Sequence, residues 1–337
     1  MSFYTAASLA REARFEALYD PAQLQARQEE IIGGGAGVIL FNRPVLYAII
    51  LSPLSLLPYD RAFLVWLVLN SVALVGCWVW AIRSFGCQAA VFGVLYPPAL
   101  LGVAHGQDCA ILLCLATGAF VLAGRNRPLW SGALLGMGLF KFHLFLLWPL
   151  AIVVRRDWKM LTGFGLSGGA VWLAPSLAMG WSSYLRLLAS HEADVLALSA
   201  HKQISVWGLT ANFGIVPIWW STALAAVVVL FVLPGIRKAG PPGLFRGAIS
   251  GSLAVAPHLY GYDATMLLLP LWQSMFQDGR GLVKQGARLL ALPPVWAFLA
   301  FEPPFAGIVS ASVLALTLLA AIAPARPLVE NGQEPTG

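Results

Sequence analysis

The stretch "FLVWLVLNSVALVGCWVWAI", residues 63–82, decides the fold class. It has no charged side chain, and its twenty residues are about the length that an α-helix needs to cross the hydrocarbon core of a bilayer. The alternation of apolar and polar residues that marks a membrane β-strand is not visible in it. The stretch therefore predicts a transmembrane helix.

The whole chain shares this character. Hydrophobic residues make up 59% of its 337 residues and charged residues 11%, whereas soluble domains carry roughly 25% charged residues; the mean hydropathy is +0.76. We predict an all-α integral membrane protein, a polytopic helical bundle forming a single domain over 1–323, with a disordered cytoplasmic tail at 324–337. About nine spans are expected, at 63–82, 87–104, 109–124, 160–180, 215–234, 247–262, 264–276, 289–301 and 305–323.

The basic residues indicate how the chain is oriented. If the segment 1–42 lies on the outer face, alternate loops place most of the 21 Lys and Arg residues on the inner side, as expected for cytoplasmic loops. The net charge of +6 is thereby explained by topology, with the lipid bilayer as partner and no nucleic acid. We predict a multi-pass protein of the cytoplasmic (inner) membrane whose active face is periplasmic or extracellular.

Two apolar stretches do not fit simple crossings. Basic clusters on both sides of 129–154 predict a re-entrant hairpin with arms 129–140 and 142–154 and with Lys141 and His143 at its tip; a bent single helix with a snorkelling lysine is the alternative. The segment 43–61 is interrupted by two prolines and is read as an interfacial or re-entrant helix.

Signatures of soluble enzymes and of metal sites are missing from the sequence. It contains no Walker loop, G-x-S-x-G, H-E-x-x-H or paired C-x-x-C motif. The four cysteines lie in or beside apolar runs and are read as packing residues. No metal and no cofactor are predicted.

Polar residues gather in the turns expected on the outer face. These turns read "AHGQDC" (104–109), "SHEADVLALSAHK" (190–202), "PHLYGYDA" (257–264) and "FEPP" (301–304), and they hold four of the five histidines. Polar side chains at membrane depth are costly and usually line a cavity or pair with one another. We therefore expect the functional site on this face.

One candidate group lies in the turn 257–264. Asp263 is suited to accept a hydroxyl hydrogen bond, hold a cation or act as a base, or it caps the next helix. His258 and Tyr262 suit sugar hydroxyls or phosphate, or they are interfacial aromatic residues.

The other candidates come from three separate segments. His105, Gln107 and Asp108 form either a polar cluster facing an outer cavity or a turn with an N-cap. Lys141 and Arg43 are candidate phosphate ligands; the alternatives are a snorkelled or paired lysine and an ordinary interfacial arginine.

Several stretches together resemble glycosyltransferase family 87, polytopic GT-C enzymes similar to the polyprenol-phosphate-mannose-dependent mannosyltransferases. They occur in the family's order and are "SFYTAASLAREARFEALYDPAQLQARQ" (2–28), "PVLYAIILSPLSLLPYDRAFLVWLVLN" (44–70), "HGQDCAILL" (105–113), "LWSGALLGMGLFKFHLFLLWPLAIVVRRDWK" (129–159) and "PHLYGYDATMLLLP" (257–270).

The resemblance implies a function and a mechanism. A hexose, mannose by this resemblance, would pass with inversion from a polyprenyl-phosphate donor to a lipid or glycan acceptor. A carboxylate in the first outer loop would deprotonate the acceptor, while cationic and polar side chains hold the departing lipid phosphate.

The chain departs from the family pattern at three places. Phe142 replaces a common proline, and Asp108 stands where the family commonly has asparagine. The family's first helix and catalytic Asp have no counterpart in it, and counting back from Phe3 puts that Asp two residues before Met1. We therefore expect an N-terminally truncated enzyme with little activity of its own; the alternatives are a transporter or flippase for a lipid-linked sugar, or a non-catalytic GT-C-like membrane protein.

Overall fold

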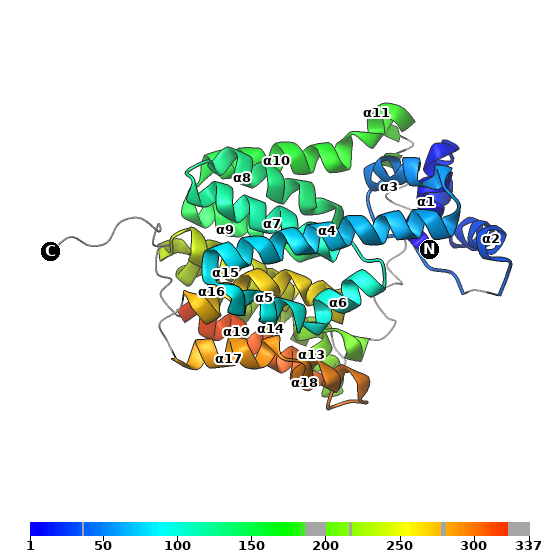
Figure 1. The fold of residues 1–337 in the computed structure, drawn as a ribbon. Helices are drawn as coiled ribbons and strands as arrows, with labels where there is room; N and C mark the ends of the chain where they lie inside the picture. The colour runs from blue at the N-terminus through cyan, green and yellow to red at the C-terminus, as the bar shows by residue number, and fades with distance from the viewer. Residues whose placement is uncertain (36, 183, 186–199, 216–217, 278–280, 323–337) are drawn as a thin grey trace.

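A computed structural model describes residues 1–322 except 36, 183, 186–199, 216–217 and 278–280. All regular structure in these described residues is helical, and the helices form a bundle in which most axes run side by side (Figure 1). The predicted all-α fold is confirmed. The tail 324–337 and most of the turn 190–202 lie outside the described residues.

Helix α4, Tyr59–Phe85, contains the stretch that decides the fold. Pro58 precedes its first turn, and Gly86 ends it with a positive φ of 87° that glycine adopts without strain. Its buried residues, among them Trp66, Leu74 and Ala81, follow one face, whereas Val72 on another face is 65% exposed. An exposed apolar face is what a membrane-spanning helix presents to lipid.

The nine predicted spans are not confirmed. Within the described residues, two helices are long and apolar enough to cross a membrane, α4 and residues Ile218–Arg237 of α14 (Ile218–Lys238), and up to four if each of two bent pairs is one span. The predicted span 87–104 is one such pair, α5 (Cys87–Val94) and α6 (Pro97–Ala104), bent by 56° where Pro97 begins the second helix. Proline and glycine thus divide runs that are continuously apolar in sequence.

The remaining helices follow the predicted runs with shifted ends. Predicted span 109–124 coincides with α7, whereas predicted span 289–301 is divided because Pro293 starts a new helix after α17. Their bounds are α7 Cys109–Gly124, α10 Trp158–Leu173, α11 Pro175–Met179, α13 Val206–Asn212, α15 Pro241–Val255, η6 Gly261–Leu267, α16 Leu268–Phe276, α17 Gly281–Ala291, α18 Pro293–Ala297, η7 Phe298–Ala300 and α19 Gly307–Ile322.

The run 129–154 bends sharply. It comprises α8 (Pro128–Met137), the 3-10 segment η3 (Gly138–Phe145) and α9 (Trp148–Arg155), with a bend of 115° between Pro128–Phe145 and Trp148–Arg155. Lys141 has non-helical angles, φ −124° and ψ 59°. The helical arms are shorter than expected, and the sharp bend falls between Phe145 and Trp148, a few residues after the predicted tip. Lys141 interrupts the first arm with its non-helical angles.

Glycines fix this segment against α10. A Cβ atom on Gly132 would lie 1.9 Å from the carbonyl oxygen of Met160, and one on Gly163 would lie 2.0 Å from that of Leu129. Only glycine permits such a close approach of two backbones. The α8–α10 contact therefore holds the turn that carries Lys141.

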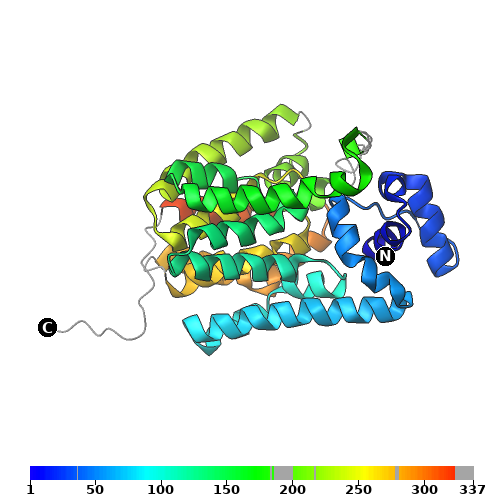
Figure 2. The ribbon, with the colours of Figure 1, turned by 90° about the horizontal axis from the view of Figure 1, so that it is seen from above.

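The N-terminal helices lie together at one end of the bundle (Figures 1 and 2). They are α1 (Ser2–Arg11), η1 (Phe15–Tyr19), α2 (Pro21–Ile32), α3 (Val45–Leu51) and η2 (Ser52–Leu56). Leu9 and Leu18 are fully buried, and α1 packs on α3 and η2. The polar opening of the chain is thus attached to the end of the bundle where α4 begins.

Candidate active site

Four charged residues from distant parts of the sequence meet inside the protein. Arg43 precedes α3, Asp108 begins α7, Lys141 lies in η3 and Asp263 lies in η6. Their exposed fractions are 5%, 0%, 2% and 1%. Charged side chains this deeply buried are normally paired. The structure thus brings four of the candidate residues into one cluster, which we call the ion cluster.

The ion cluster alternates in charge. Arg43 Nε donates to Asp108 Oδ2 at 3.0 Å, and Lys141 Nζ lies 3.2 Å from Asp108 Oδ1 and 2.5 Å from Asp263 Oδ1. Two cations and two carboxylates therefore form a chain in the order Arg43, Asp108, Lys141, Asp263. As a unit the cluster is neutral, and this compensates for its burial.

Asp263 combines two of the roles that the sequence left open, those of a helix cap and of a partner for a cation. Its Oδ2 accepts a hydrogen bond from the backbone N–H of Tyr260 at the start of η6, while its Oδ1 pairs with Lys141. Tyr96 Oη donates to the carbonyl oxygen of Ala264, which ties η6 to the junction of α5 and α6. The carboxylate is therefore both a helix cap and an ion-pair partner.

Cys109 takes part in the site although the sequence suggests apolar packing for it. It is fully buried, and its Sγ lies 3.4 Å from both Asp263 Oδ1 and Lys141 Nζ. Cys109 is therefore buried as expected of a packing residue, but its sulfur contacts two charged groups of the ion cluster. Its position next to Asp108 is the only sequence signal for this role.

A row of polar aromatic rings leads away from the lysine. Lys141 Nζ lies 5.4 Å from the ring centre of Tyr262, and ring contacts continue from Tyr262 to Tyr260 at 5.6 Å and from Tyr260 to His258 at 4.8 Å. His258 in turn lies 5.7 Å from His143. Rings of this kind bind a cation through their faces and hydroxyl-bearing ligands through their edges.

Two histidines, His258 and His143, lie near the ion cluster. Partial burial, assisted by the nearby Lys141 and Arg43, lowers the pKa of His258, and Asp263 opposes this shift. His143 is 8% exposed, and its Nε2 has no hydrogen-bond partner among the described residues. The sequence places His143 at the hairpin tip but does not mark it as a site residue.

His105 and Gln107 lie at the edge of the site. His105 is exposed, its Nδ1 is 2.8 Å from the carbonyl oxygen of Leu101, and its ring is 6.4 Å from that of Tyr262. Gln107 is half-buried in the turn before α7, and its backbone N–H donates to the carbonyl oxygen of Gly102. Neither side chain belongs to the ion cluster.

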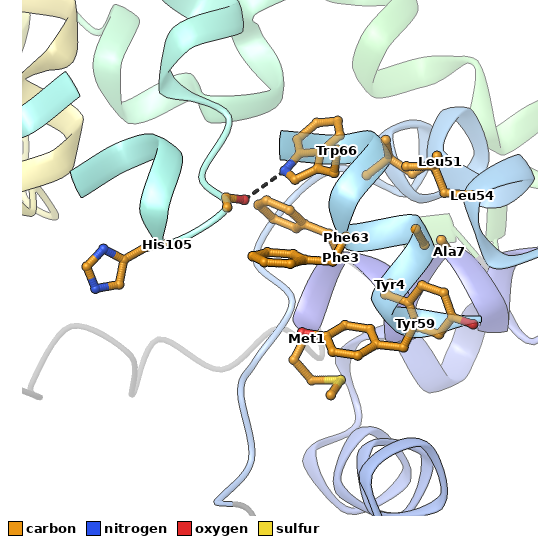
Figure 3. Close-up of a pocket in the computed structure, with 12 residues that line it drawn as sticks. Met1, Phe3, Tyr4, Ala7, Leu51, Leu54, Tyr59, Phe63, Trp66 and His105 are labelled. Carbon is orange, nitrogen blue, oxygen red and sulfur yellow. Dashed lines mark hydrogen bonds between the residues drawn. The ribbon is translucent and has the colours of Figure 1, made fainter. Parts of the chain in front are cut away.

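A small cavity separates His105 from the N-terminal helices (Figure 3). Met1, Phe3 and Trp66 line it, and Trp66 Nε1 donates to the carbonyl oxygen of Gly106 at 2.8 Å, the dashed line in Figure 3. Phe3 also lies under the guanidinium of Arg43, 5.6 Å from its carbon to the ring centre. The first residues of the chain thus border the ion cluster.

Metal ligands are not grouped in the described part of the chain. Nowhere in these residues do three or more His, Cys, Asp or Glu side chains gather in a way that suits a metal ion.

The fold and the site together define a helical membrane protein with a cluster of charged residues buried where its helices end. Residues 41–270, more than half of the chain and including all four members of the ion cluster, match Glycosyltransferase family 87. The chain belongs to this family and is a membrane glycosyltransferase. Comparisons with curated proteins and with solved structures found no match.

Proposed function

We propose that the protein transfers a hexose, predicted to be mannose, from a polyprenyl-phosphate donor to a lipid or glycan acceptor. The observation that carries this proposal is the ion cluster, in which Lys141 and Arg43 are buried together beside polar rings. Because both cations are paired in the structure, a phosphate would have to take the place of Asp108 or Asp263 at one of them. In such a water-poor site the attraction between the cations and the phosphate would be weakly screened.

The proposed reaction needs a group that stabilises the leaving phosphate. The acceptor hydroxyl oxygen forms a bond to the anomeric carbon, the bond from that carbon to the phosphate oxygen breaks, and polyprenyl phosphate leaves with the electron pair. Lys141 and Arg43 are the residues proposed to stabilise its added negative charge. His258 and Tyr262 are proposed to orient the sugar or the phosphate through hydrogen bonds.

The two carboxylates are better suited to position the cations than to remove the acceptor proton. Both oxygens of Asp108 accept from Arg43 or Lys141, and both oxygens of Asp263 have partners, Lys141 and the Tyr260 N–H. A base needs an open position toward the hydroxyl that it deprotonates. Neither Asp108 nor Asp263 is therefore proposed as the base.

The proposed location is the periplasmic or extracellular face of the cytoplasmic membrane, within a single polytopic domain over 1–323. Its support is the segregation of charge in the sequence, with basic loops on one side and the site turns on the other. A soluble nucleotide-sugar donor does not reach that face, whereas a lipid-linked donor does.

Binding of the leaving lipid phosphate by the purified chain tests this proposal without requiring turnover. A polyprenyl phosphate is titrated against the wild-type protein in detergent, together with Lys141→Arg and the exposed control Lys159→Met. We expect Lys141→Arg to keep the charge and the fold but to weaken binding about tenfold, since the guanidinium does not reproduce the compact ammonium between two carboxylates.

The control Lys159→Met is expected to bind like the wild type. Equal affinity of the wild type and Lys141→Arg would count against the phosphate site. Transport of a lipid-linked sugar across proteoliposome membranes, with no transfer to any acceptor in the presence of an upstream segment, would favour the flippase alternative instead.

A further inference from the structure

Two of the four cysteines meet where α4 packs on α7. Cys77 on α4 is 2% exposed, whereas Cys114 on α7 is exposed. Their thiol groups are in hydrogen-bond contact, and neither cysteine is in a disulfide. We call these two residues the thiol pair. Apolar packing, which the sequence suggests for both residues, does not require their sulfur atoms to meet.

Contacts on either side of the thiol pair show that α4 and α7 run in the same direction. Before it, Trp66 Nε1 donates to the carbonyl oxygen of Gly106, in the turn that leads into α7. After it, the ring centre of Trp80 lies 5.8 Å from that of Phe120. The partners are 40 residues apart in both contacts. The thiol pair lies between these two contacts, so the packing of the two helices sets its position.

The two members of the thiol pair differ in what can reach them. Helix α7 has no charged side chain, so an exposed side chain in its middle faces the hydrocarbon of the bilayer. Cys114 is therefore open to apolar compounds dissolved in lipid, whereas polar reagents enter the hydrocarbon at a high cost. Cys77 is shielded by the protein from both kinds of compound.

An accessible cysteine beside a second, resolving cysteine is the arrangement that reacts reversibly with peroxides. The accessible sulfur is oxidised to a sulfenic acid, and the neighbouring thiol condenses with it to form a disulfide. A disulfide needs Cα atoms about 4.4–6.8 Å apart, a separation that facing positions on two closely packed helices provide. In the thiol pair, Cys114 has the place of the accessible residue and Cys77 that of the resolving residue.

We propose that the thiol pair is an oxidation site for organic hydroperoxides dissolved in the bilayer, and that it closes into a Cys77–Cys114 disulfide between α4 and α7. The disulfide would hold α7 on α4, and α7 begins directly after Asp108 of the ion cluster. The inference is independent of the proposed function, because no donor or acceptor of a sugar takes part in the oxidation.

The proposed oxidation has two steps. The sulfur of Cys114 forms a bond to the outer oxygen of the hydroperoxide, the O–O bond breaks, and the alcohol leaves with the thiol proton, so that Cys114 becomes a sulfenic acid. The sulfur of Cys77 then bonds to the Cys114 sulfur, and the hydroxyl group leaves as water with the Cys77 proton. Two thiols and one hydroperoxide thus give one disulfide, one alcohol and one water.

Mass spectrometry of the purified full chain in lipid nanodiscs tests this inference. The apolar cumene hydroperoxide is compared with hydrogen peroxide at the same concentration. Remaining thiols are then alkylated and counted, and linked peptides are identified. The variants are Cys77→Ala and Cys114→Ser, and Cys87→Ser is the matched control because Cys87 is an exposed cysteine on another helix, α5.

Cumene hydroperoxide should link Cys77 to Cys114, and dithiothreitol should reverse the link. The link should form about tenfold faster than with hydrogen peroxide, because the apolar peroxide concentrates in the hydrocarbon. Cys114→Ser should abolish the link, and Cys87→Ser should leave it unchanged. In Cys77→Ala, the sulfenic acid on Cys114 should persist and be trapped by dimedone.

Several outcomes would overturn the inference. All four thiols still being free after treatment would show that the two cysteines only pack. A disulfide that uses Cys87 or Cys109 would assign the oxidation to another site. Equal dimedone labelling of Cys114 in the wild type and in Cys77→Ala would show that Cys77 does not reach the oxidised sulfur. A link that forms equally fast with hydrogen peroxide would exclude access from the lipid. If Cys77→Ala does not fold, the wild-type linkage and Cys114→Ser still decide the question.

Discussion

Replacing Lys141 by methionine tests the ion cluster most directly. The side chain keeps a similar length but loses its charge, so Asp108 and Asp263 are left buried with Arg43 as the single cation of the cluster. The cluster then changes from neutral to a net charge of −1 in a place where its members are at most 5% exposed.

The structure sets the size of the effect. At an effective dielectric constant of about 20, two opposite charges about 3 Å apart attract each other by roughly 5 kcal/mol, and Lys141 makes two such contacts, at 3.2 and 2.5 Å. The substitution also removes the cost of desolvating the Lys141 ammonium, so the net loss of stability is smaller than the sum of the two attractions. Measured losses on breaking a buried pair are about 3–5 kcal/mol, and we expect Lys141→Met to lower the free energy of unfolding by this amount.

Reversible unfolding in mixed micelles, followed by fluorescence of the 13 tryptophans, provides the assay. Asp263→Asn added to Lys141→Met restores neutrality, and the double variant should be at least about 2 kcal/mol more stable than Lys141→Met alone. The exposed control Lys159→Met should change stability by less than about 0.5 kcal/mol. A loss below about 1 kcal/mol for Lys141→Met, or no rescue by Asp263→Asn, would refute the idea that the cluster balances its own charge.

Three further predictions use the same unfolding assay. Gly132→Ala should lower the free energy of unfolding by about 1–3 kcal/mol, because its Cβ would meet the Met160 carbonyl oxygen at 1.9 Å. Gly165→Ala, with no atom within 4 Å of its Cβ, should leave that free energy unchanged or raise it by up to about 1 kcal/mol. Equal effects of the two substitutions would contradict the close α8–α10 contact. Asp20→Ala should cost about 1 kcal/mol, because the carboxylate caps α2; hydrogen bonds from Gln23 hold the pKa of Asp20 below its usual range, so this contribution should be present near neutral pH and disappear as the pH falls through that lowered pKa. The pKa of His258 is lowered in the folded protein, so the unfolded chain binds the His258 proton at a higher pH than the folded chain does. The free energy of unfolding should therefore fall as the pH drops below about 6.5. His258→Gln should flatten this dependence between pH 7 and 5, and an unchanged dependence would assign it to other titratable groups.

The sequence predicts the fold class well and the helix ends unevenly. The bounds of α7 follow from the sequence because the polar turn at Asp108 and the basic residue Arg125 flank a continuous apolar run. The division at Pro97 and Pro293 was missed, because a hydropathy reading averages over prolines that change the direction of the chain. The count of spans depends on these bends and therefore did not follow from composition.

The members of the ion cluster were predictable, but their pairing was not. A charge inside an apolar run is costly, so Lys141 and Asp263 attract notice in the sequence alone. Which carboxylate meets which cation depends on how α7, η3 and η6 pack, and one sequence does not contain that information. His143 was placed at the hairpin tip but was not marked as a site residue, because a single histidine at a turn has no distinctive pattern.

The order of the four charged residues along the chain has a consequence for how the ion cluster forms during synthesis. Because the ribosome makes the chain from the N-terminus, Arg43 and Asp108 are synthesised first and can neutralise each other. The arrival of Lys141 then leaves one surplus positive charge, which stays uncompensated until Asp263 emerges more than a hundred residues later. A nascent chain that stops before residue 263 therefore contains Lys141 without the carboxylate of Asp263 that balances its charge. The last third of the chain thus supplies the carboxylate that completes the ion cluster, whose other three members lie in the first two thirds.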